Sequence, residues 1–132
     1  MYEILQHTAD VRLRVTASTL EELFSDALRG LMAVMGGNVV GAHGVRPENV
    51  EIESVDVTAL LVDFLNEALV RAHVQRRSFT GASFASLTET HLAATLMSVP
   101  AEFEEDVKAV TYHEAEVRCG DNGWTTMLVL DI

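Results

Sequence analysis

Residues 11–37, VRLRVTASTLEELFSDALRGLMAVMGG, predict a β-strand followed directly by an α-helix. Apolar and polar side chains alternate over residues 11–17, and this period of two is typical of a half-buried strand. The apolar residues that follow recur at helical spacing, and we expect Ser18 to be the N-cap, with Glu21 as its capping-box partner. The helix should end at Gly36 and Gly37, because glycine readily adopts the left-handed conformation that terminates helices.

A second strand and a second helix are expected next. Residues 50–55 alternate between apolar and acidic side chains, which indicates a strand. Asp56 stands where a helix N-cap belongs, and the residues after it form an apolar stripe at helical spacing. This predicted helix should extend into the basic residues Arg76 and Arg77, because cations are favoured in its last turns.

The second half of the chain changes character and predicts mainly strands. Gly120–Gly123, with sequence GDNG, is a strong hairpin signal because its residues tolerate positive φ. Two early helices and several late strands predict a single α+β domain over residues 1–132, with both helices packed on one face of a mainly antiparallel sheet. The expected late strands are residues 82–87, 91–98, 109–118 and 124–130, after a break at 78–81.

The charge of the chain restricts its partners. Twenty Asp and Glu residues against nine Lys and Arg residues give a net charge of −11. Gripping nucleic acid through its phosphates needs clustered basic residues, so a cation site or a basic protein partner fits better. The single cysteine, Cys119, excludes a disulfide within the chain and a cysteine-based zinc site. Neither a signal peptide nor a membrane span is expected, which predicts a cytoplasmic protein.

Three carboxylates stand at notable positions. Asp10 comes immediately before the first predicted strand, Asp131 is the penultimate residue, and Asp63 lies on the second helix. If Ile132 ends a buried strand, its α-carboxylate and Asp131 are adjacent oxygen groups, and a neighbouring Asp10 would add a third. Such a cluster repels itself without a cation, and oxygen ligands suit Ca²⁺ or Mg²⁺. The alternative is that Asp131 merely exits a strand into solvent.

Histidine and lysine residues give weaker indications. The five histidines include neither a pair at i, i+4 nor an HExxH motif. His7 and Asp10 are candidates for a base and its orienting partner, although a contact within an N-terminal turn is the simpler role. Lys108, the only lysine, follows an acidic run and is either a solvated loop residue or a contact residue at a functional edge.

Five segments in one order resemble the archease family. The similarity covers essentially the whole chain, and each motif alone would be weak. The segments are His7–Val11 (HTADV), Thr19–Phe24 (TLEELF), Leu60–Glu67 (LLVDFLNE), Val107–His113 (VKAVTYH) and Leu128–Ile132 (LVLDI).

The resemblance implies an accessory protein rather than an enzyme. Members of the archease family are cofactors of the RtcB-type RNA ligase, which joins tRNA halves after intron removal and repairs RNA breaks. They promote guanylylation of the ligase histidine, speed multiple turnover and broaden nucleotide use. The resemblance also implies a divalent cation, usually Ca²⁺, bound by Asp10, Asp131 and Ile132, the last through main-chain or terminal oxygens.

Two further residues match family positions. Lys108 matches a lysine of the family, which makes it a candidate contact residue for the ligase. Asp63 also matches a family position, where a helix residue is placed to orient the His7–Asp10 segment rather than to bind metal.

Other functional classes stay open at this stage. A metal-dependent hydrolase would use His7 and Asp10 with a bound water, but the sequence has no recognised catalytic motif. A general acidic chaperone or adaptor would use the charged surface without a metal. Direct RNA binding is disfavoured by the charge, so RNA is expected to be contacted only through the ligase.

Overall fold

The computed structural model describes residues 1–6, 10–40 and 44–132. None of the helices in these ranges has both the length and the apolar character needed to cross a membrane. The elements are, in chain order, β1 (Tyr2–Gln6), β2 (Asp10–Ala17), α1 (Leu20–Met35), β3 (Asn38–Val39), β4 (Arg46–Glu53), α2 (Val57–Gln75), β5 (Arg77–Leu87), β6 (His91–Glu102), β7 (Ala109–Thr111), β8 (Arg118–Gly120) and β9 (Gly123–Asp131).

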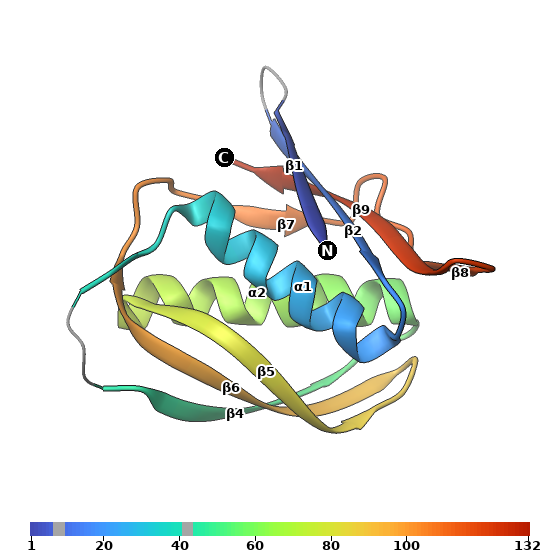
Figure 1. The fold of residues 1–132 in the computed structure, drawn as a ribbon, viewed down its shortest axis with the longest axis horizontal. Coiled ribbons are helices and arrows are strands. Elements are labelled where there is room, and N and C mark those ends of the chain that lie inside the picture. Colours follow the sequence, from blue (N-terminus) through green and yellow to red (C-terminus); the bar gives the residue numbers. More distant parts are fainter. Residues whose placement is uncertain (7–9, 41–43) are drawn as a thin grey trace.

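The strands form two antiparallel sheets with the helices between them (Figure 1). One sheet has the order β1-β2-β9-β7, and β8 pairs with the other end of β9. In the second sheet β6 is central and pairs with β3, β4 and β5. The α+β class with two helices and mainly antiparallel strands is confirmed, and the structure adds the division into two sheets.

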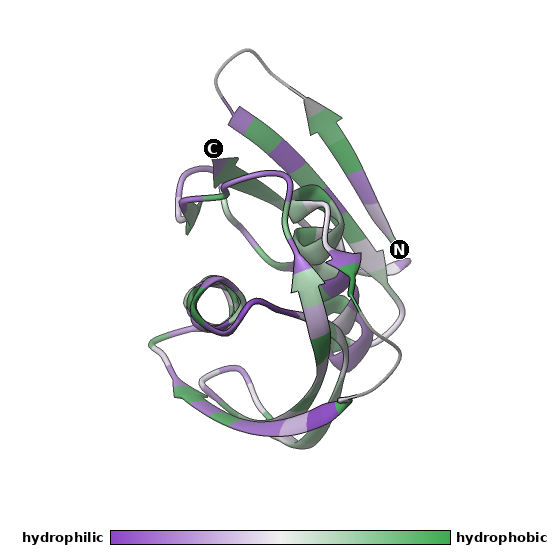
Figure 2. Ribbon diagram, turned by 90° about the vertical axis from the view of Figure 1, so that its left-hand side faces the viewer, coloured by the Kyte–Doolittle hydropathy of each residue, from purple (hydrophilic) through white to green (hydrophobic). Residues whose placement is uncertain are grey.

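Aromatic side chains join the layers. Phe24 of α1 lies 5.8 Å from Phe64 of α2, and both rings lie about 6 Å from Phe84 of β5 (6.2 and 6.1 Å between centroids). Such separations allow edge and tilted ring contacts that add to the burial of apolar area. Figure 2 shows the alternation of hydrophobic and hydrophilic residues along the strands that makes one face of each sheet apolar.

The helix ends follow the predicted chemistry with two corrections. α2 ends at Gln75, with Arg76 as its C-cap and Arg77 already in β5, so these two arginines do not lie in its last turn as predicted. Thr19, not Ser18, is the N-cap of α1, and its hydroxyl accepts the N–H of Glu22 at 3.1 Å. The shift arises because the capping-box pattern occurs twice in succession, one residue apart. Gly36 ends the helix with φ 66°, and Asp56 caps α2 by accepting the N–H of Ala59 at 2.8 Å, both as predicted.

The predicted strand at 109–118 is wrong in one respect, because a turn divides it into β7 and β8. The N–H of Ala115 donates to the carbonyl of Tyr112 at 3.1 Å, and Glu114 has φ 59°. Both short strands pair with β9, and the predicted hairpin at 120–123 is confirmed by the pairing of Gly120 with Gly123.

Several strand boundaries also differ from the predictions. β4 covers Arg46–Glu53 where residues 50–55 were expected, and β6 continues to Glu102 where residue 98 was the expected end. β5 begins at Arg77, so the expected break at 78–81 is instead part of a strand that carries register shifts. β1 was not predicted, and it lengthens the sheet by pairing with β2.

Candidate cation site at the ends of β2 and β9

The β2–β9 pairing places two acidic residues opposite one another. Asp10, the first residue of β2, is the direct partner of Asp131, the last residue of β9. Directly opposed residues project from the same face of a sheet. The next pair, Val11 and Leu130, is buried and fixes the register, because a slip by one residue would expose the core side. The structure therefore places the two acidic residues that the sequence singled out opposite each other, with Asp131 exposed to solvent.

The side chain of Asp10 is only partly exposed (28 %). Its Oδ1 is buried and has no hydrogen-bond partner within the described parts of the chain. The nearest cation is the Nε of Arg12 at 3.9 Å, which is beyond hydrogen-bond distance. A buried carboxylate oxygen without a donor is costly, so this position favours a positively charged partner.

The chain end lies beside this pair. Ile132 is half-buried and packs against the core, which holds the residue after Asp131 in place. Side-chain carboxylates and main-chain oxygens are hard ligands that fit Ca²⁺ or Mg²⁺. Over residues 1–6, 10–40 and 44–132, no group of three or more His, Cys, Asp and Glu side chains is assembled for a metal ion. His7 lies outside the described residues.

The main chain of Lys108 contacts Asp131, at the end of β9. Its N–H donates to the carbonyl oxygen of Asp131 at 2.7 Å, and its side chain is exposed. Val107, immediately before it, is buried and anchors the segment. Lys108 is thus the basic residue at the start of the strand that pairs with the end of β9.

Asp63 lies on α2 and forms hydrogen bonds with Ser54 and Tyr112. Its carboxylate accepts the hydroxyl of Ser54 at 2.6 Å and the hydroxyl of Tyr112. The hydrogen bond to Asp63 raises the pKa of Tyr112 above its ordinary value, and burial and nearby negative charge act in the same direction. Asp63 therefore ties α2 to the turn that follows β7.

Two residues that the sequence did not single out fix the 107–111 segment. The side-chain amide of Asn66 donates to the carbonyl of Val110 at 2.8 Å and accepts its N–H at 2.9 Å. The Nε2 of His73 lies 3.1 Å from the carbonyl oxygen of Val107. The spacing of three polar residues, Asp63, Asn66 and His73, places them on one face of α2. This spacing is the feature of the sequence from which a polar contact of the helix could have been predicted.

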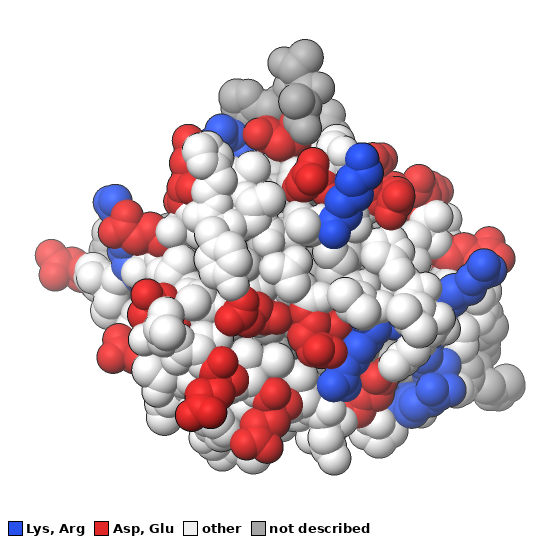
Figure 3. Space-filling view, turned by 180° about the vertical axis from the view of Figure 1, so that it is seen from behind, with Lys and Arg blue, Asp and Glu red and all other residues white. Residues whose placement is uncertain are grey.

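The surface around these elements carries few cations. Figure 3 shows the side opposite that of Figure 1, with acidic side chains scattered across it among fewer basic ones. Several basic residues are already paired, including Arg71 with Glu67 at 3.0 Å and Arg118 with Glu116 at 2.9 Å. A phosphate-binding surface needs clustered, available cations, and the described residues on this face do not supply such a cluster.

The family model described as the archease protein family matches residues 2–132. The chain belongs to the archease family. Curated relatives include the archease of Thermococcus gammatolerans, which is 33 % identical over 144 residues with 99 % of this chain and 98 % of the relative covered. The archease of Methanosarcina acetivorans is 30 % identical over 142 residues, with 99 % and 95 % covered. The archease family assignment suggested by the sequence motifs is confirmed.

Solved structures of the family share the fold. The solution structure of a Methanobacterium thermoautotrophicum protein superposes with a TM-score of 0.72 at 26 % identity, covering 99 % of this chain and 98 % of that one. A Thermotoga maritima archease, described as a possible chaperone, also gives a TM-score of 0.72, at 16 % identity, with 100 % and 98 % covered. The second similarity concerns the fold alone.

Proposed function

We propose that this archease-family protein is a non-enzymatic activator of an RtcB-type RNA ligase in tRNA splicing and RNA repair. It acts in the cytoplasm, promotes guanylylation of the ligase and supports its multiple turnover. The observation that carries the proposal is the pairing of Asp10 with Asp131 beside a half-buried Ile132. This arrangement coincides with the residues that the family resemblance assigns to a divalent cation.

Asp10, Asp131 and the main-chain oxygens of Ile132 would hold the cation, with Ca²⁺ as the expected ion. When bound, the cation supplies positive charge that favours binding of anionic nucleotide phosphates. Lys108 would add a second positive group at the same edge, since its N–H is bonded to Asp131. In this proposal the protein positions the cation, because β2 and β9 hold its carboxylate ligands, and the ligase binds the RNA.

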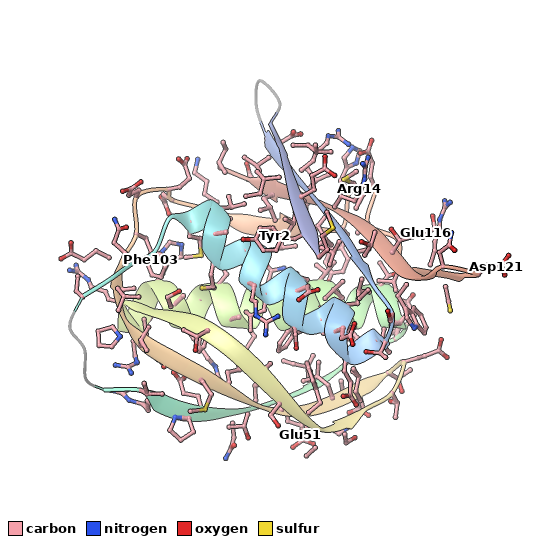
Figure 4. The ribbon with its side chains drawn as sticks, viewed as in Figure 1. Tyr2, Arg14, Glu51, Phe103, Glu116 and Asp121 are labelled. Atoms are coloured by element: carbon pink, nitrogen blue, oxygen red, sulfur yellow. The ribbon has the colours of Figure 1, made fainter. Side chains whose placement is uncertain are left out.

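The test measures guanylylation and multiple turnover of a cognate ligase with Asp10→Ala and Asp131→Ala. Both variants should lose most of the stimulation. Asp121→Ala is the matched control, because Asp121 lies at the tip of the β8–β9 hairpin, at the other end of β9 (Figure 4). Full stimulation by both site variants, with the control also active, would exclude the proposal.

A general chaperone is the second candidate, and the description of the Thermotoga maritima relative as a possible chaperone favours testing it. Suppression of aggregation of unrelated client proteins, with no effect of a chelator or of Asp10→Ala, would support this alternative. Catalytic turnover by the isolated protein would instead support a metal-dependent hydrolase.

A further inference from the structure

Arg12 lies between two acidic residues at the edge of the cation site. Since it is two residues after Asp10 on β2, it projects from the same face of the sheet. Its Nε is 3.9 Å from Oδ1 of Asp10, and its guanidinium forms an ion pair with Glu114. Arg12 is therefore shared between the carboxylate of the site and a carboxylate outside it.

The two facing atoms of Arg12 and Asp10 are both buried. Neither the Nε nor the Oδ1 has a hydrogen-bond partner among the residues that the structure describes. At 3.9 Å the charges attract one another but the hydrogen bond is not made. A small movement of the guanidinium toward Asp10 would form it, and that movement would loosen the contact with Glu114.

Glu114 is held in place independently of Arg12. It lies in the turn closed by the hydrogen bond from Ala115 to Tyr112, and its φ of 59° is one that residues other than glycine seldom adopt. Tyr112, at the start of the turn, is bonded to Asp63 of α2. The turn is thus anchored to the helix, and its carboxylate draws Arg12 away from Asp10.

We propose that Arg12 is an internal competitor of the divalent cation for Asp10 and that Glu114 limits this competition by holding the guanidinium aside. The inference concerns the regulation of the cation site and rests on the proposed function. Without the divalent cation, Arg12 supplies the nearest positive charge, among the described residues, to the buried Oδ1 of Asp10. With the cation, the ion pair with Glu114 keeps Arg12 occupied.

Calorimetric titration of the whole protein with Ca²⁺ tests this directly. Arg12→Gln should tighten Ca²⁺ binding by about fivefold, because a competing positive charge is removed. Glu114→Gln should weaken binding by a similar factor, because Arg12 is released toward Asp10. In the Arg12→Gln background, Glu114→Gln should then have almost no effect.

Matched controls separate this competition from general charge effects. Arg14→Gln removes the same charge from the same face of β2, where Arg14 is paired with Glu3 at 3.6 Å. Glu116→Gln removes a carboxylate that is paired with Arg118 in the same region of the sheet (Figure 4). Both controls should change the affinity much less than the variants of Arg12 and Glu114.

Thermal unfolding with a chelator gives a second reading. Arg12→Gln should unfold at a lower temperature than the unaltered protein in chelator, because Asp10 loses its nearest cation. Saturating Ca²⁺ should raise the unfolding temperature of Arg12→Gln by more than it raises that of the unaltered protein. A variant that loses stability under both conditions, with no gain in Ca²⁺ affinity, would show that Arg12 is merely structural and would overturn the inference.

The result with Asp10→Asn separates the two proposals. Unchanged Ca²⁺ binding in this variant would reject the cation site itself, and the regulatory role would fall with it. Loss of Ca²⁺ binding in Asp10→Asn, combined with unchanged affinity in Arg12→Gln, would reject the competition alone. Equal effects of Glu114→Gln in both backgrounds would also reject it, because they would reflect only the lost negative charge.

Discussion

Asp10 and Asp131 face each other directly across β2 and β9, so two carboxylates share one face of the sheet at the ends of its two central strands. Like charges in this arrangement destabilise a strand pair. In the presence of a chelator, Asp131→Asn should therefore raise the free energy of unfolding by up to about 1 kcal/mol. Urea unfolding at low salt measures the change, which should shrink at high salt. Asp121→Asn at the hairpin tip should change little, and a loss of stability in Asp131→Asn would contradict the expected repulsion.

Deletion of Ile132 should weaken Ca²⁺ binding. The half-buried side chain packs against the core and fixes the main chain beside Asp131, so its loss frees the donors at this end. Titration calorimetry measures the affinity. Ile132→Val keeps the main chain and most of the packing and should bind almost normally. Equal affinity of the deletion variant and the unaltered protein would remove Ile132 from the site.

Asn66→Ala should destabilise the protein by about 2–3 kcal/mol, because the N–H and carbonyl of Val110 both lose their partner in a partly buried position. Asn66→Asp should not restore stability, since a carboxylate cannot donate to the carbonyl. Urea unfolding with an unchanged m-value checks both variants. If the free energy of unfolding of Asn66→Ala lies within about 0.5 kcal/mol of that of the unaltered protein, water replaces the hydrogen bonds of the amide.

Tyr112→Phe should change how stability depends on pH. The hydrogen bond to Asp63 raises the pKa of Tyr112 in the folded protein, so its contribution is fully present below the ordinary pKa near 10. It is lost as the pH rises through the higher folded value. The variant should lack this loss and be less stable at pH 8 by less than about 1 kcal/mol, because the ring is largely exposed. Parallel pH profiles of the two proteins between pH 8 and about 11 would argue against the bond.

Gly123→Ala should be strongly destabilising. Gly123 has φ 101°, and an added Cβ would clash with the carbonyl oxygen of Ala17. We expect a loss of at least about 2 kcal/mol, measured by thermal or urea unfolding. Gly120→Ala is the control on the same hairpin, because its Cβ would meet nothing within 4 Å. Similar losses at the two glycines would point to hairpin flexibility instead of the clash.

Local patterns were sufficient for the elements with strong periodicity. The alternation in β2, the apolar stripes of both helices and the stop at Gly36 depend only on neighbours in the sequence. The turn at Tyr112–Ala115 was missed because it contains neither glycine nor proline, and Glu114 adopts the left-handed conformation in which glycine is the usual residue.

In the candidate site, too, some features could be predicted from local sequence and others depend on contacts between distant segments. Their positions in the sequence and the family resemblance selected Asp10 and Asp131, but only the pairing of two distant strands places them opposite each other. The roles of Asn66 and Glu114 depend on segments that lie far away in the sequence, against α2 and β2 respectively. Such contacts leave no periodic signal, because periodicity reports which face is buried and not what covers it.

The β2–β9 ladder joins residues almost the whole length of the chain apart, whereas β5 and β6 are neighbours in the sequence. Contacts between distant residues form late, because the entropy of closing the intervening loop must be overcome first. The acidic pair exists only once two strands from opposite ends of the chain have paired. A protein that recognised both residues together would therefore bind folded chains and not unfolded ones.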